Sequence, residues 1–125
     1  MCVLIVDDEE IIRVLATKIL QRAGMTTQTA DSSQNGLRLV AENPAVYKLA
    51  ILDLSMPGMS GVDLIREIRR FIPGIPCILS SGYPINDSDV SDDIKPNTFF
   101  LQKPYKPQEL TLLVQSILGT TPVKV

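Results

Sequence analysis

The stretch Val3-Leu4-Ile5-Val6-Asp7-Asp8 decides how the rest of the chain is interpreted. Its four consecutive apolar residues show no alternation with polar ones, and they predict a short strand that is buried on both faces. A run of the same form, Leu49-Ala50-Ile51-Leu52-Asp53, predicts a second strand of this kind. Strands buried on both faces are typical of a parallel sheet that lies between two layers of helices.

Segments with helical periodicity alternate with such strands. From Ile12 to Ala23 apolar residues recur every three or four positions, which predicts an amphipathic helix that ends at Gly24. Further helices are expected from Ser32 to about Glu42, from Ser60 to Phe71 and from Pro107 onward. We expect the second of the four helices to bury Leu37, Val40 and Ala41, and the third to bury Leu64, Ile65, Ile68 and Phe71.

Three more strands complete the predicted order. They are expected at Thr26–Ala30, a polar edge strand, at Cys77–Leu79 and at Phe99–Leu101. Residues 83–97 contain two prolines and four aspartates, so only a short or frayed helix is expected there. Five strand–helix repeats predict one doubly wound α/β domain with a parallel sheet.

The composition excludes several kinds of chemistry. The chain has no histidine and a net charge of −2. Catalysis by histidine, histidine metal sites and a phosphohistidine on this chain are therefore excluded, and direct binding of nucleic acid is not expected. We expect no signal peptide and no membrane span, and a cytoplasmic protein in which Cys2 and Cys77 stay reduced. The arginines at positions 66, 69 and 70 suggest only a solvated helix face.

Polar side chains stand where the predicted strands end. Asp7 and Asp8 follow the first strand, Asp53 the third, Ser81 the fourth and Lys103 the fifth. Each position alone has a plain structural explanation, such as a helix start or a turn. Because the carboxyl ends of parallel strands share one edge of the sheet, we expect them to meet there. Converging carboxylates need a cation such as Mg²⁺, and the lysine and hydroxyl suit an anionic group, which together predict phosphoryl transfer to a carboxylate.

These motifs, in this order, resemble the receiver domain of bacterial response regulators. The resemblance rests on Val-Asp-Asp-Glu at 6–9, Leu-Asp-Leu-Ser-Met-Pro-Gly-Met at 52–59, Ser-Gly at 81–82 and Lys-Pro at 103–104. It implies a flavodoxin-like (βα)5 fold, a three-layer sandwich with sheet order 2-1-3-4-5. It also implies a receiver domain in residues 1–118, with a C-terminal tail in residues 119–125.

The resemblance implies a role for each acidic position. Asp53 would be the phosphorylated residue. Mg²⁺ would be bound by Asp8, Asp53 and the backbone carbonyl of Ser55, and Asp7 would act largely through a coordinated water. No other cofactor is implied.

The remaining matches concern the phosphoryl group and the response to it. Lys103 would pair with Asp53 and then with a phosphoryl oxygen, across a cis bond to Pro104. Ser81 would hydrogen-bond another phosphoryl oxygen. Phe100 would be the aromatic residue that switches position together with Ser81.

The implied function is that of a phosphoacceptor that changes conformation when phosphorylated. Its partner would be a histidine kinase or a histidine phosphotransfer protein, with no direct contact to nucleic acid or membrane. The domain would catalyse its own phosphorylation and slow dephosphorylation without being an enzyme in the usual sense, as a monomer or weak dimer. Ser-Ser-Gly-Tyr-Pro at 80–84 and Leu-Gln-Lys-Pro-Tyr at 101–105 resemble receivers at the ends of hybrid histidine kinases.

Three alternatives remain at this point. One is a receiver-like interaction module that does not use phosphate. A haloacid-dehalogenase type phosphatase would need its nucleophile on the first strand, in an Asp-x-Asp arrangement that this chain does not have. A flavin- or nucleotide-binding module would need a glycine-rich loop after that strand, where the chain instead has Asp7-Asp8-Glu9.

Overall fold

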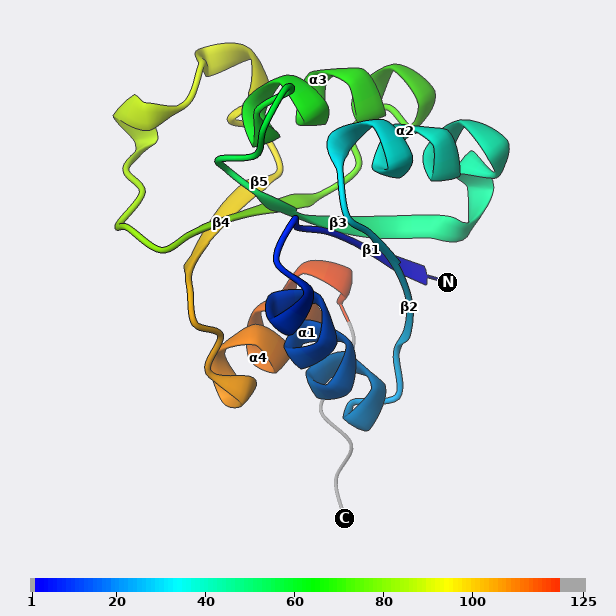
Figure 1. The fold of residues 1–125 in the computed structure, drawn as a ribbon, viewed down its shortest axis with the longest axis vertical. Coiled ribbons are helices and arrows are strands. Elements are labelled where there is room, and N and C mark those ends of the chain that lie inside the picture. Colours follow the sequence, from blue (N-terminus) through cyan, green and yellow to red (C-terminus); the bar gives the residue numbers. More distant parts are fainter. Residues whose placement is uncertain (1, 120–125) are drawn as a thin grey trace.

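Five parallel strands form one sheet in the order β2-β1-β3-β4-β5 (Figure 1), in a computed structural model that describes residues 2–119. The predicted flavodoxin-like fold and strand order are confirmed. The predicted tail lies outside the described residues except for Gly119. The strands are β1 (Cys2–Val6), β2 (Thr26–Ala30), β3 (Tyr47–Asp53), β4 (Cys77–Ser81) and β5 (Thr98–Gln102).

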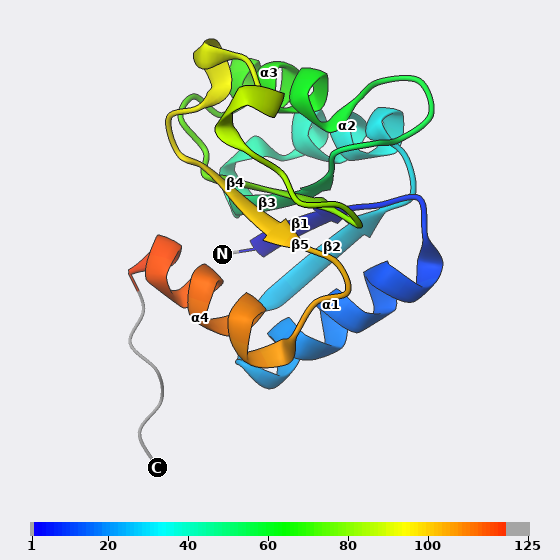
Figure 2. The same cartoon turned by 90° about the vertical axis from the view of Figure 1, so that its left-hand side faces the viewer.

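Four α-helices cover the two faces of this sheet. Helices α1 (Glu10–Arg22) and α4 (Pro107–Leu118) lie on one face, and α2 (Ser33–Glu42) and α3 (Gly61–Phe71) lie on the other (Figures 1 and 2). Alternate residues of β1 enter different core clusters: Leu4 and Val6 pack with α2 and α3, while Val3 and Ile5 pack with α1 and α4. This confirms that the apolar run is a strand buried on both faces.

The buried face of α2 differs from the prediction. Ser32 caps the helix as expected, because its side chain accepts a hydrogen bond from the Asn35 amide. Ala41 is exposed, however, and the most buried positions of the helix are Ser33, Gly36 and Val40. A Cβ atom at Gly36 would lie 2.9 Å from Val6 Cγ2, so this glycine lets α2 approach β1 closely, and the helix is rotated accordingly.

Helix α3 begins as predicted and ends differently. The Ser60 side chain accepts from the Asp63 amide, and Leu64, Ile65 and Ile68 are buried. The prediction that Phe71 is buried was wrong, because its side chain is 48% exposed. It is the last residue of the helix, and the following residue, Ile72, packs against the core in its place.

The segment between β4 and β5 contains no α-helix in the described residues. It forms two 3₁₀ turns, Asp87–Asp89 and Asp92–Ile94, in line with the expected weak helix. Two arginines of α3 bind this segment, so the expectation of a merely solvated face was wrong for them. Arg66 pairs with Asp93 and donates to the Ser91 hydroxyl. Arg69 donates to the carbonyls of Ile75, Ile94 and Asn97 and to the Thr98 hydroxyl.

Two further expectations concern the cysteines and the membrane. Cys2 and Cys77 are both buried free thiols, on strands that β3 separates. Within residues 2–119, no helix combines the length and hydrophobicity that crossing a membrane requires.

Candidate functional site

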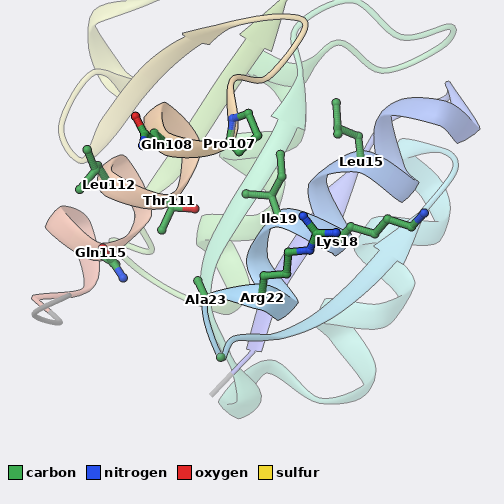
Figure 3. Close-up of a pocket in the computed structure, with 11 residues that line it drawn as sticks. Leu15, Lys18, Ile19, Arg22, Ala23, Pro107, Gln108, Thr111, Leu112 and Gln115 are labelled. Carbon is green, nitrogen blue, oxygen red and sulfur yellow. The ribbon is translucent and has the colours of Figure 1, made fainter. Parts of the chain in front are cut away.

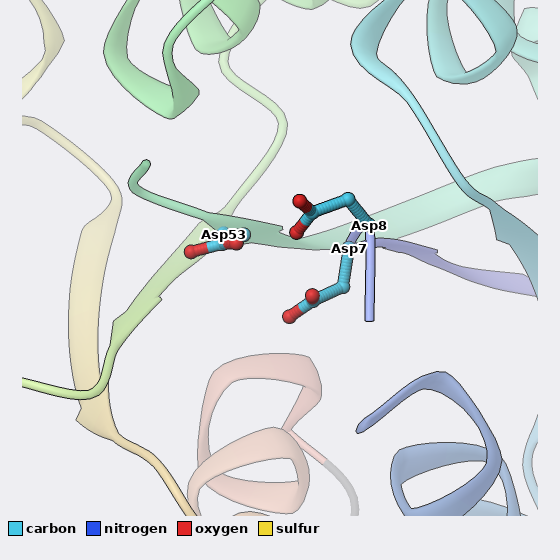
Figure 4. A group of neighbouring side chains, drawn as sticks. All are labelled: Asp7, Asp8 and Asp53. Atoms are coloured by element: carbon cyan, nitrogen blue, oxygen red, sulfur yellow. The ribbon is translucent and has the colours of Figure 1, made fainter. Parts of the chain in front are cut away.

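Three carboxylates converge at the carboxyl ends of two neighbouring strands. Asp7 and Asp8 follow β1, and Asp53 is the last residue of β3 (Figure 4). One carboxylate oxygen from each residue lies within 4.8 Å of the other two. The sheet places them together because the chain leaves β1 toward α1 on one face and β3 toward α3 on the other, which opens the edge between the two strands.

Lys103, the residue that follows β5, extends its side chain to this group. Its Nζ atom lies 2.8 Å from Asp7 Oδ2, 3.4 Å from Asp53 Oδ1 and 3.4 Å from Glu9 Oε1. The Lys103 side chain is only 9% exposed, and Asp7 and Asp53 are buried, so these two contacts are largely shielded from solvent, whereas the Glu9 side chain is 59% exposed. Asp7 is thus the nearest partner of the lysine. Glu9 was not predicted as a site residue, although it completes the Val-Asp-Asp-Glu motif.

Burial and neighbouring charges determine the protonation states of Asp53 and Lys103. Burial and the neighbouring Asp7 raise the pKa of Asp53 from 3.8 to about 6, although Lys103 and the Ser55 amide act in the opposite direction. Burial lowers the pKa of Lys103, but its contact with Asp7 and the charge of Asp53 outweigh that effect and raise it overall. Lys103 therefore remains an ammonium ion at neutral pH.

The donor set matches a divalent cation with oxygen ligands. Lys103 supplies one positive charge, whereas Asp7, Asp8 and Asp53 together supply up to three negative charges. Asp7 Oδ2 is buried and has no aligned hydrogen-bond donor among residues 2–119; its contact with the lysine is an ion pair. Carboxylate oxygens of this kind are the ligands that Mg²⁺ prefers. The acidic pocket could therefore bind a metal ion.

The loop after β3 supports the acceptor position. The Ser55 amide donates to Asp53 Oδ1 at 3.2 Å, and the Ser55 side chain is exposed. A Cβ atom at Gly61 would clash with the Asp53 carbonyl oxygen, so only glycine allows α3 to begin directly against the end of β3.

Ser81 and Phe100 lie on the next two strands. Ser81 ends β4, next to β3, and its hydroxyl accepts a hydrogen bond from the Tyr83 amide at 3.0 Å. Phe100 is half-buried in β5 and packs against the core cluster on the α2 and α3 face. Neither residue hydrogen-bonds to the three carboxylates within residues 2–119.

Two residues beneath the site were missed from the sequence. Tyr105 is buried, and its hydroxyl donates to the buried Ser80 hydroxyl at 2.8 Å. Both residues lie inside the motifs at 80–84 and 101–105, but their contact joins separate segments, and periodicity carries no signal for it. The Lys103–Pro104 bond is cis, as the resemblance implied.

A groove of about 930 Å³ lies between α1 and α4 (Figure 3). Its walls combine apolar side chains, such as Ile19 and Leu112, with the cationic Lys18 and Arg22. None of the acidic residues described above lines it. The groove is therefore separate from the candidate site.

Comparison with known proteins agrees with this geometry. The sequence model of the response regulator receiver domain matches residues 3–115. An NtrX-like response regulator of Rickettsia bellii is 32% identical over 98% of this chain, and the sensor kinase CckA of Brucella abortus is 31% identical over 93%. A crystal structure of the receiver domain of the hybrid histidine kinase CckA superposes with a TM-score of 0.82, at 27% identity, covering 94% of this chain and 99% of that one.

The chain belongs to the response regulator receiver domain family. It is a receiver domain of two-component signalling, a class whose members interact with histidine kinases or phosphotransfer partners. It spans 26% of the length of the Rickettsia relative and 12% of the length of the Brucella kinase.

Proposed function

We propose that this domain accepts a phosphoryl group on Asp53 from a phosphohistidine of a histidine kinase or a histidine phosphotransfer protein. The observation that carries the proposal is a buried carboxylate that lies 3.4 Å from the ammonium group of Lys103, whose side chain is only 9% exposed, and beside two further carboxylates. This is the combination of nucleophile, charge clamp and cation site that phosphoryl transfer requires.

In this reaction a carboxylate oxygen of Asp53 attacks phosphorus. The bond between phosphorus and the donor nitrogen breaks, and its electron pair returns to the imidazole. The backbone amide of Ser55 holds one oxygen of Asp53 and so orients the carboxylate. Ionised Asp53 is required, because a protonated carboxyl is a poor nucleophile.

Two positively charged groups, Lys103 and a metal ion, would neutralise the negative charge of the transferred phosphoryl group. Lys103, already directed at Asp53 Oδ1, pairs with a phosphoryl oxygen. Asp8, Asp53 and the Ser55 carbonyl would hold Mg²⁺, with Asp7 acting through water. Once bound, the ion neutralises charge on the phosphoryl oxygens.

Ser81 and Phe100 would change conformation when Asp53 is phosphorylated. The Ser81 hydroxyl accepts a hydrogen bond from the Tyr83 amide, and its own proton would be donated to a phosphoryl oxygen. This new hydrogen bond would draw residues 82–90 toward Asp53 and change the space beside Phe100, which is half-buried.

The surface beside the site suits a helical partner. Ile11 is 75% exposed and Val14 is 44% exposed, both on the first turns of α1 that follow the acidic residues. Exposed apolar side chains spaced three residues apart form a stripe that can pack against helices carrying the phosphohistidine.

The wider assignments are part of the same proposal. Residues 1–118 form the receiver domain, residues 119–125 a tail, and the domain acts in the cytoplasm as a monomer or weak dimer. It makes no direct contact with nucleic acid, in keeping with the net charge of −2.

The test is the intact mass after incubation with acetyl phosphate and Mg²⁺. The proposal predicts one added phosphoryl group, lost when EDTA is present or when Asp53 is replaced (Asp53→Asn). Asp31→Asn, which changes an exposed aspartate outside the site, should keep the wild-type adduct. A folded protein that stays unmodified by acetyl phosphate and by phosphorylated partners would instead be an interaction module.

A further inference from the structure

Tyr105 occupies an unusual place for a phenol. It lies two residues after Lys103, in the loop between β5 and α4, and its ring is buried in the core cluster formed with α1 and α4. Its hydroxyl donates to Ser80 Oγ at 2.8 Å. Burial raises the pKa of Tyr105 to about 12, so the phenol keeps its proton and remains a donor.

Ser80 connects this hydroxyl to the acceptor strand. It is fully buried and pairs with Asp53 in the register between β3 and β4. Its carbonyl accepts a hydrogen bond from the amide of Leu54, the residue that follows Asp53, at 2.8 Å. A displacement of Ser80 would therefore also displace the end of β3, where Asp53 lies.

The loop that carries Lys103 is attached to β4 at two points. The Lys103 amide donates to the Ser81 carbonyl at 2.7 Å, and the Tyr105 hydroxyl forms the second attachment at Ser80. The ammonium group of Lys103 extends from this doubly held loop to Asp7 and Asp53.

We propose that Tyr105 is a positioning residue for phosphoryl transfer: through its hydrogen bond to Ser80, it fixes the loop that presents Lys103 to Asp53. The inference rests on the proposed function of Asp53. Tyr105 does not touch the reacting atoms. It acts by keeping the lysine in the geometry from which a phosphoryl oxygen can be bound, because small displacements of a charge clamp lower the rate.

The first experiment compares Tyr105→Phe, Ser80→Ala and the double variant with the wild type. The readouts are the initial rate of phosphoryl incorporation from acetyl phosphate at saturating Mg²⁺, and the melting temperature. Each single change should lower the rate about two- to tenfold, as expected for one hydrogen bond. Tyr47→Phe is the matched control, because Tyr47 is also buried but lies at the opposite end of β3.

The double variant separates positioning from simple stabilisation. It removes both partners of the Tyr105–Ser80 hydrogen bond, and the only other bond lost with Ser80 Oγ, among the described residues, is a long one of 3.5 Å to the Leu52 carbonyl, so most of the melting temperature should recover. A positioning role predicts that the rate stays low, no lower than in the slower single variant, since one shared bond is lost. A wild-type rate in Tyr105→Phe, or a restored rate in the double variant, would overturn the proposal.

A second readout does not depend on phosphorylation. Acetylation of Lys103 by acetic anhydride, measured against the exposed Lys48, should be slow in the wild type and faster in Tyr105→Phe. Cys77 reports on the fold, because this fully buried thiol must stay unreactive in both proteins. If the wild type took up no phosphoryl group, the proposed function would fail, but this labelling would still test whether Tyr105 positions Lys103. Equal acetylation rates of Lys103 in the wild type and in Tyr105→Phe would refute the positioning role of Tyr105.

Discussion

The ammonium group of Lys103 lies closer to Asp7 than to Asp53, at 2.8 Å against 3.4 Å. In the unphosphorylated domain the lysine therefore compensates mainly the carboxylate that is not the proposed acceptor. Burial and the charge of Asp7 keep the pKa of Asp53 raised, at about 6, despite the neighbouring lysine. The following predictions test what each member of this site does.

Replacing the lysine should separate phosphoryl transfer from metal binding. In Lys103→Met the charge clamp is lost, and we expect phosphorylation by acetyl phosphate to slow by about 10²-fold. Affinity for Mg²⁺ should rise, because a competing positive charge has been removed from the carboxylates. Initial rates by intact mass and Mg²⁺ titration by calorimetry measure the two effects. Lys106→Met, at an exposed position, is the control; a rate within twofold of the wild type in Lys103→Met would refute the clamp.

Mg²⁺ binding should depend on pH through Asp53. Its pKa is about 6 in the folded protein instead of 3.8, so a proton competes with the ion at pH values where an ordinary aspartate is fully ionised. The affinity should be nearly constant above pH 7 and fall as pH drops through 6, by about tenfold per unit below the pKa. Titration calorimetry between pH 5 and 8 measures this. Asp53→Asn should show a flatter profile, and equal affinities at pH 5 and 7 in the wild type would contradict the prediction.

The sequence predicts the sheet and most of the site because strong local signals mark both. Apolar runs such as Val3–Val6 end in the carboxylates that the parallel sheet then brings together. What it did not predict depends on contacts between distant segments. The buried face of α2 depends on the close approach of Gly36 to Val6. Tyr105 contacts Ser80 because β4 and β5 are neighbours in the sheet.

Arg69 shows the same limitation and provides a stability prediction. Its side chain connects α3 to the segments that lead into β4 and β5. Removing it leaves the carbonyl groups of these segments without their donor. We expect Arg69→Ala to lower the free energy of unfolding by roughly 2–4 kcal/mol in urea titrations. Arg69→Lys should recover less than half of the loss, since an ammonium group cannot span these acceptors. Arg70→Ala, at a side chain that is 76% exposed, should change stability by less than about 0.5 kcal/mol, and a similar loss there would argue against the bridge.

The exposed stripe on α1 should matter only for protein donors. Ile11→Asp places a charge in the proposed contact with a helical partner, and we expect transfer from a phosphorylated histidine phosphotransfer protein to slow at least tenfold. Phosphorylation by acetyl phosphate should stay unchanged, because this small donor needs no docking surface. Phe71→Asp, at an exposed apolar residue of α3, is the matched control. Equal slowing with both donors would place the defect in the site and not in docking.

The central claim is that Asp53 itself carries the phosphoryl group. The most direct measurement is reduction of the phosphorylated domain with borohydride, which converts an aspartyl phosphate to homoserine, followed by peptide mapping by mass spectrometry. The account predicts homoserine at position 53 and no conversion at Asp7 or Asp8. Conversion at either of those residues, with Asp53 unmodified, would contradict it.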